Sequence, residues 1–148
     1  MIKIASALIV YDHKLLLHLR DGGHPDPNLK NKWGLVGGTI EQDENPLTAV
    51  RREIKEETNL NPNNVEYLGK LEISKSEGKM EAHLFCSRLT DKETKQLKLG
   101  NEGTDVRFFT TVEIANLSLS PEVKKYYLTN HEEIDSFIND GVIPKIKT

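Results

Sequence analysis

Three glutamates stand close together in the sequence at a spacing that suits chemistry. Glu53, Glu56 and Glu57 occupy positions i, i+3 and i+4, so in a helix their carboxylates leave the same face. Like charges at this spacing repel each other unless a cation lies nearby. Because carboxylate oxygens suit hard divalent ions, the pattern predicts a site for Mg²⁺ or Mn²⁺. Taken alone, such an acidic run is also typical of a solvent-exposed helix face.

Other charged residues flank these three glutamates. Glu41 and Glu44 precede the expected helix, and their side chains can reach the same place from the loop. Arg51 and Arg52 belong to the helix itself, where one of them could pair with a carboxylate and fix its orientation. We therefore expect the acidic side chains to converge near the start of this helix.

The helix that must position these groups has marked ends. Asn45 is a favourable N-cap, Pro46 suits the first helical position, and Asn59 suits a left-handed residue at the C-terminus. A stripe of three apolar residues at spacings of three and four is predicted to face the core: Leu47, Val50 and Ile54.

The remaining pattern predicts a mixed sheet flanked by helices, an α/β or α+β fold. Strands are expected at residues 2–11, 15–20, 33–40, 65–74, 79–89 and 106–109. Helices are expected at residues 110–117, from Ser120-Pro121 onward, and from Asn130 to near Gly141. With no repeat or linker in the sequence, we expect residues 1–148 to form a single domain.

Composition narrows the classes of partner. The 20 basic and 23 acidic residues give a net charge of −3, which argues against duplex nucleic acid as a partner. The single cysteine, Cys86, excludes an internal disulfide and a multi-cysteine zinc site, and it fits a cytoplasmic location. No apolar run approaches the roughly 20 residues that a membrane span needs. Cys86 is expected to be buried, and His18 and His83 are expected in surface or packing roles.

The segment from Gly38 to Leu60 resembles the Nudix box. The family pattern is G-x5-E-x7-R-E-U-x-E-E-x-G-U, where U is a bulky aliphatic residue, and every position matches except the last glycine, which is Asn59 here. The chance of the other eight positions aligning at random is on the order of 10⁻⁶. Weaker similarity extends outward, to Trp33 and the residues that follow it and to a later segment beginning at Glu102 that looks MutT-like.

This resemblance implies an α/β/α sandwich in which the box forms a loop–helix–loop. It also implies hydrolysis of a diphosphate linked to some other group X, with divalent metal ions. By position, Glu53, Glu56 and Glu57 would be metal ligands, and one of them could act as the base. Gly37 would offer a backbone carbonyl to the metal, and Gly38 would permit close approach of the loop.

The resemblance also implies roles for residues around the metal ligands. Glu44 and Arg52 would hold the helix and loop in register. Glu102 would be the late acid that some MutT-like members bring to the metals or the attacking water, with an exposed loop glutamate as the equal alternative. Arg20 is a candidate phosphate ligand and Trp33 a candidate nucleobase stacker, each weighed against a surface or core role.

The expected activity is metal-dependent hydrolysis of a small nucleotide-type substrate, a (d)NTP or modified nucleotide, to NMP and pyrophosphate. A non-catalytic sensor of a nucleotide derivative is an alternative, although the chain retains the whole glutamate set. Nucleotide sugars, dinucleoside polyphosphates and RNA 5′ ends are alternative substrates. The sequence does not identify group X or the base preference, and the resemblance leaves a homodimer open.

Overall fold

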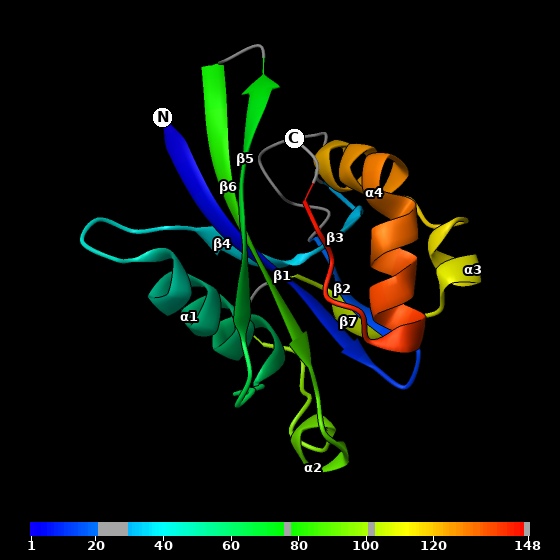
Figure 1. Ribbon diagram of the computed structural model, residues 1–148. Coiled ribbons are helices and arrows are strands. Elements are labelled where there is room, and N and C mark those ends of the chain that lie inside the picture. Colours follow the sequence, from blue (N-terminus) through cyan, green and yellow to red (C-terminus); the bar gives the residue numbers. More distant parts are fainter. Residues whose placement is uncertain (21–29, 76–77, 101–102, 147–148) are drawn as a thin grey trace.

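The computed structural model describes residues 1–20, 30–75, 78–100 and 103–146 (Figure 1). Its strands are β1 (Ile2–Tyr11), β2 (Lys14–Leu19), β3 (Trp33–Gly34), β4 (Val36–Thr39), β5 (Glu66–Lys75), β6 (Gly78–Arg88) and β7 (Asp105–Phe109). Its helices are α1 (Pro46–Thr58), α2 (Asp91–Thr94), α3 (Thr111–Ile114) and α4 (Pro121–Asp140).

The strands form one mixed sheet around β1. β1 runs parallel to β6 along nearly its whole length, while the other pairings are antiparallel. β4 pairs with the first half of β1, and β2 pairs with the last two residues of β1. β2 in turn pairs with β3 and β7, whereas β5 pairs with β6 at the other side of the sheet. The predicted fold of a mixed sheet with helices is therefore confirmed.

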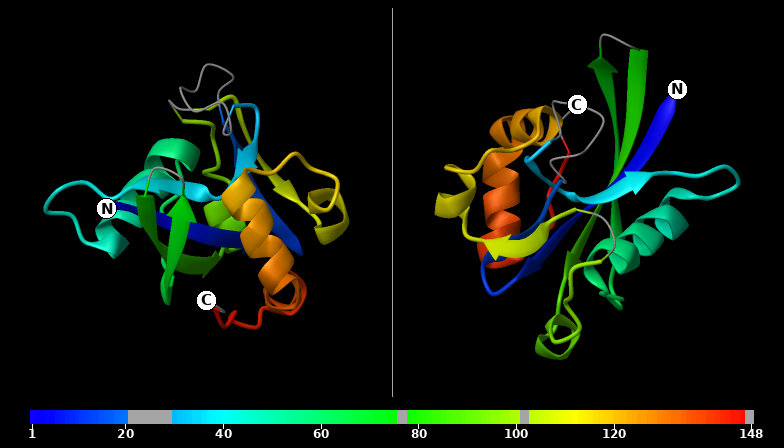
Figure 2. Two further views of the ribbon diagram at one scale, coloured as in Figure 1. Left: turned by 90° about the horizontal axis from the view of Figure 1, so that it is seen from above. Right: turned by 180° about the vertical axis from the view of Figure 1, so that it is seen from behind.

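The two faces of the sheet carry separate cores. Because strand residues alternate between faces, Ala5, Ala7 and Ile9 of β1 pack with α1, whereas Leu8 and Val10 pack with α4. Figure 2 shows α1 and α4 on opposite sides of the sheet. Within the described residues, no helix is long and apolar enough to cross a membrane.

The ends of α1 are where the sequence predicts them. The Asn45 side chain accepts a hydrogen bond of 2.8 Å from the backbone N–H of Thr48, and Pro46 is the first helical residue. Asn59 adopts the left-handed conformation with φ of 62°, and its backbone N–H donates to the carbonyl of Lys55. The helix that carries the glutamates thus starts and stops through its own local signals.

The predicted apolar stripe of α1 is wrong at Leu47. Val50 and Ile54 are buried as expected, but 43% of Leu47 is exposed and Ala49 is buried instead. The reason is that α1 is rotated so that Glu53 and Glu57 also turn inward. Its buried face is therefore partly acidic.

Two further elements differ from the predicted ones, and a third agrees with its prediction. Residues 33–40 form two strands, since β3 pairs with β2 and β4 pairs with β1. The two helices expected after residue 120 are the two parts of α4, which are separated by a kink at Asn130, where φ is −121° and ψ is 22°. The predicted helix boundary at Asn130 is therefore confirmed. The short helix α2 was not predicted, although its capping box of Thr90 and Glu93 is a readable signal.

Candidate active site

Two glycines at β4 bring the sheet against α1. The backbone N–H of Gly37 donates a 2.8 Å hydrogen bond to Oε1 of Glu57. A Cβ on Gly37 would lie 2.2 Å from the carbonyl oxygen of Ala5, and a Cβ on Gly38 would lie 2.6 Å from the carboxylate carbon of Glu53. At Gly37 the obstacle is backbone, so only glycine fits there, whereas at Gly38 a Cβ would displace the Glu53 carboxylate. The Gly38 backbone thus lies close to the Glu53 carboxylate.

Arg52 stands at the centre of the acidic cluster. Its Nε and Nη2 donate to the two carboxylate oxygens of Glu44 at 2.7 and 3.0 Å. Its Nη1 lies 2.9 Å from Oε1 of Glu53 and 3.3 Å from Oε2 of Glu56, while Nη2 also donates to the carbonyl of Thr39. Arg52 therefore ties α1 to the end of β4, and its single positive charge is shared among the carboxylates of Glu44, Glu53 and Glu56.

This ion pair changes the acidity of both partners. The hydrogen bonds from Arg52 and from the backbone N–H of Glu41 lower the pKa of Glu44 from 4.5 to about 2. The same pairing raises the pKa of Arg52. Glu44 is therefore ionised throughout the neutral range, which keeps the bidentate pair intact there.

The three box glutamates lie in different environments. Glu57 is 0% exposed and Glu53 is 8% exposed, whereas 52% of the Glu56 side chain is open to solvent. Carboxylates are rarely buried unless they are paired or bind a metal. Burial of Glu53 and Glu57 beside the Gly37-Gly38 loop is not what a solvent-exposed acidic face would show.

Glu57 also faces two basic side chains from β2 and its end. Its Oε2 lies 3.3 Å from Nδ1 of His18 and 3.6 Å from Nη1 of Arg20. His18 is 0% exposed. Sequence reasoning predicted the packed position of His18 as one of two options but missed its place beside Glu57. The available signal was a single polar residue among the leucines of β2.

The donor atoms suit a hard divalent cation, because carboxylate oxygens surround the loop–helix junction. Within the described residues, however, no three His, Cys, Asp or Glu side chains converge closely enough to hold a metal as they stand. Arg52 engages Glu53 and Glu56, and the N–H of Gly37 engages Glu57. The residues thus fit a metal ion in their chemistry. Binding would require Glu53 and Glu56 to turn from Arg52, whereas the Glu57 carboxylate has further lone pairs and can keep its hydrogen bond from Gly37.

A cleft of about 380 Å³ opens beside the Gly37-Gly38 loop. Across it, Nζ of Lys75 on β5 lies 2.7 Å from Oε1 of Glu122 in the first turn of α4. The cleft is lined by polar and apolar side chains from the sheet and from the start of α4, namely Ile2, Ile4, Ser6, Arg20, Leu35, Thr39, Lys75, Met80, Ser120, Glu122 and Val123.

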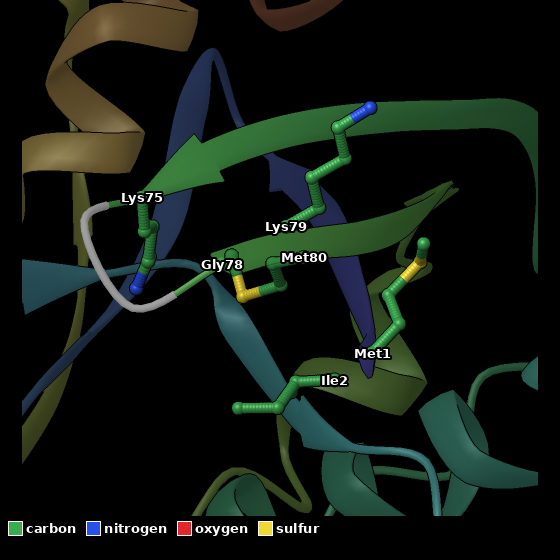
Figure 3. A pocket seen from close by; sticks show the side chains of 6 residues that line it. All are labelled: Met1, Ile2, Lys75, Gly78, Lys79 and Met80. Atoms are coloured by element: carbon green, nitrogen blue, oxygen red, sulfur yellow. The ribbon is translucent and has the colours of Figure 1, made fainter.

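A second hollow of about 340 Å³ adjoins this cleft and shares Ile2, Lys75 and Met80 with it. Figure 3 shows its lining, in which the Lys79 side chain points away from these three residues. The shared lining makes the second hollow an extension of the cleft toward the end of the β5–β6 hairpin.

Comparison with known proteins places this loop–helix–loop in a family. Residues 1–129 match the family described as the NUDIX domain. The chain belongs to the NUDIX domain family. No curated protein matches the sequence.

Solved Nudix structures share the fold at low identity. The NUDIX domain of Shewanella oneidensis NrtR, complexed with ADP ribose, is 20% identical with a TM-score of 0.70, over 84% of this chain and 82% of that one. The MutT protein of Methanosarcina mazei Go1 is 22% identical with a TM-score of 0.66, over 95% of this chain and 94% of that one.

A third similar structure is larger than this chain. It is a bifunctional NMN adenylyltransferase/ADP ribose pyrophosphatase from Francisella tularensis, complexed with AMP and a Mn ion. It is 19% identical with a TM-score of 0.68, and the match covers 90% of this chain but 42% of that one. These similarities concern the fold.

The other residues singled out from the Nudix resemblance fall in several places. Arg20 and Gly38 line the cleft. Trp33 packs edge-on against Phe109, with ring centroids 4.8 Å apart, which favours its core role over stacking on a nucleobase. Glu102 lies outside the described residues, so its role stays a prediction. Cys86 is buried as predicted, and burial raises the pKa of its thiol to about 11.

Proposed function

We propose that this Nudix protein is a divalent-metal-dependent hydrolase that cleaves a diphosphate linkage in a nucleotide derivative. The substrate is a (d)NTP or modified nucleotide, which is converted to NMP and pyrophosphate. The observation that carries the proposal is the closed loop–helix junction, where Glu53 and Glu57 are buried against Gly37 and Gly38 at the edge of the cleft.

Each part of the junction has a role in this proposal. Glu53, Glu56 and Glu57, with the carbonyl of Gly37, would hold Mg²⁺ or Mn²⁺. A bound ion would neutralise charge that develops on the diphosphate oxygens. The guanidinium of Arg20, which lines the cleft 3.6 Å from Glu57, would bind a phosphate oxygen.

Two residues act on the protein instead of the substrate. Glu44 and Arg52 hold α1 against the end of β4 through a bidentate ion pair, so the ligands stay aligned. Group X would occupy the cleft, whose apolar side chains and the Lys75–Glu122 pair offer both packing and hydrogen bonding. Glu102 remains a sequence-based candidate for a further ligand or base.

Binding without turnover is the second candidate function. The observation in favour of this second function is the structural similarity to the NUDIX domain of NrtR, which was solved with ADP ribose. Retention of every box glutamate argues for the enzyme, because a module that only binds a nucleotide derivative does not need metal carboxylates.

A substrate panel with Mg²⁺ separates the two functions. The panel comprises dNTPs, oxidised dNTPs, dinucleoside polyphosphates, ADP-ribose, nucleotide sugars and 5′-triphosphate RNA, scored for phosphate, pyrophosphate or NMP release. We expect turnover of one nucleotide class, abolished by excess EDTA, because the proposed reaction needs a bound divalent cation. Undiminished hydrolysis in EDTA contradicts the metal requirement, and calorimetric binding of a compound without its hydrolysis supports the binding module.

A further inference from the structure

A buried histidine lies directly behind one of the proposed metal ligands. Strand β2 reads Lys14-Leu15-Leu16-Leu17-His18-Leu19, and His18 is its one polar residue between leucines. Alternation places Leu16 and His18 on the face of the sheet that packs with α1. An imidazole buried at 0% exposure costs more than a leucine there unless a polar neighbour compensates it.

Glu57 is one such polar neighbour. Its Oε2 lies 3.3 Å from Nδ1 of His18, while its Oε1 accepts the hydrogen bond from the N–H of Gly37. The carboxylate is thus flanked on both oxygens by groups from the sheet, and Glu57 cannot turn without leaving one of them. A carboxylate opposite Nδ1 favours the tautomer that carries its proton on that nitrogen.

The other edge of the ring is held by the chain at Gly103. Gly103 has a φ of +82°, and a Cβ there would lie 2.3 Å from Nε2 of His18. The backbone N–H of Thr104 donates to the carbonyl of Leu19 at 3.0 Å, so this segment is fixed to the end of β2. The imidazole therefore stands between Glu57 and Gly103 with little room to rotate.

We propose that His18 is a positioning residue that sets the orientation of the Glu57 carboxylate for divalent metal binding. The proposal rests on the proposed function, because it takes Glu57 as a metal ligand. Groups behind a metal ligand fix its orientation, and their loss typically costs about tenfold to a hundredfold in metal affinity or activity.

Two substitutions at position 18 separate positioning from filling space. His18→Leu keeps the volume but removes the nitrogen that faces Glu57. His18→Asn keeps a donor near the place of Nδ1 but leaves a larger void, so it should be the less stable of the two variants. We expect His18→Leu to weaken Mn²⁺ binding and to lower kcat about tenfold to a hundredfold, with KM little changed. We expect His18→Asn to recover most of both losses despite its lower Tm.

His83→Leu is the matched control. His83 on β6 also lies beside a glutamate, with Nε2 2.8 Å from Oε2 of Glu81, but outside the acidic junction. It should leave Mn²⁺ affinity and kcat at the wild-type level. Mn²⁺ affinity is measured by electron paramagnetic resonance of free Mn²⁺, and kcat and KM on the best substrate of the panel.

The outcomes distinguish the two proposals. Wild-type Mn²⁺ affinity and kcat in folded His18→Leu overturn the positioning role alone, as does an equal loss in His18→Leu and His18→Asn. Absence of wild-type hydrolysis, with Mn²⁺ binding that still depends on His18, overturns the hydrolase and supports the positioning role. Absence of wild-type Mn²⁺ binding overturns both.

Discussion

At the residue scale, Glu56 and Glu57 are neighbours in the sequence with opposite surroundings. Glu57 is fully buried and hydrogen-bonded to the N–H of Gly37, whereas Glu56 is exposed beside Arg52. Sequence reasoning treats both as members of one repelling cluster, so neutralising either should leave the metal-free protein as stable or slightly more so. Because Glu57 is buried, we expect its neutralisation to lower the stability of the metal-free protein instead.

The first prediction contrasts Glu56→Gln with Glu57→Gln. Both should lower kcat at least about a hundredfold, because each removes charge from a proposed metal ligand. Without metal, Glu57→Gln should also lose about 1–3 kcal/mol of unfolding free energy, since a buried hydrogen-bonded carboxylate is replaced. Glu56→Gln should stay within about 0.5 kcal/mol of wild type. Steady-state kinetics and urea unfolding in EDTA measure these effects, and near-normal turnover of both variants would leave the binding module as the better account.

The second prediction concerns acid stability through Glu44. The pKa of Glu44 in the folded protein is lowered from 4.5 to about 2, so its ion pair stabilises the fold above pH 4.5 and is lost as the pH falls toward about 2. The Tm difference between wild type and Glu44→Gln should be constant above about pH 5 and shrink below it. Melting curves from pH 2 to 7 test this, with the exposed Glu132→Gln as control. A Tm difference independent of pH would contradict the lowered pKa.

At the scale of elements, α1 is defined by its own ends. Asn59 departs from the glycine of the Nudix pattern, but it takes the same left-handed backbone that a glycine would. Its side chain also accepts from Nζ of Lys55 and donates to the carbonyl of Gln96. The departure therefore affects only how the helix ends.

The third prediction compares Asn59→Ala with Asn59→Gly. Alanine should cost about 1–2 kcal/mol of unfolding free energy, because a Cβ disfavours the left-handed conformation. Glycine avoids that strain but loses the two side-chain hydrogen bonds, so its effect should stay within about 1 kcal/mol. Neither change should alter kcat. Urea unfolding and kinetics measure both quantities, and a hundredfold loss of kcat in the stable glycine variant would show that the helix end contributes to the chemistry.

At the scale of the whole molecule, the cleft depends on elements far apart in the sequence. β5 and α4 meet across it through Lys75 and Glu122, and the Gly37-Gly38 loop of β4 forms another of its edges. The first turns of α4 precede the kink at Asn130, and the fully buried apolar residues of the helix follow it: Ile134, Phe137 and Ile138. The part of α4 that lines the cleft is therefore less buried than the part that follows the kink.

The fourth prediction tests this wall with Glu122→Gln. Loss of the charge weakens the pair with Lys75 and loosens the wall that group X would touch. We expect KM to rise about threefold to tenfold while kcat changes less than about twofold, the pattern of lost uniform binding. Glu132→Gln on the exposed side of α4 should change neither constant. A fall in kcat with constant KM would instead assign Glu122 to the chemical step.

Much of the site could be predicted because its signals are local. The caps of α1 act between residues three or four positions apart, and the box spacing needs only the helical repeat. The pairing of Arg52 with Glu56 follows from the i, i+4 spacing, but its bidentate pair with Glu44, eight positions earlier, does not. The exposure of Leu47 could not be predicted in this way, because packing against the sheet determines which side of α1 is buried.

The sequence by itself determined the acidic helix, its two ends and the family to which the box belongs. Only the tertiary structure placed His18 behind Glu57, split residues 33–40 between two partner strands and joined Lys75 to Glu122. Each of these depends on which segments meet when the sheet forms. Such contacts join residues far apart in the chain, 39 positions for His18 and Glu57 and 47 for Lys75 and Glu122, and no short-range spacing encodes them.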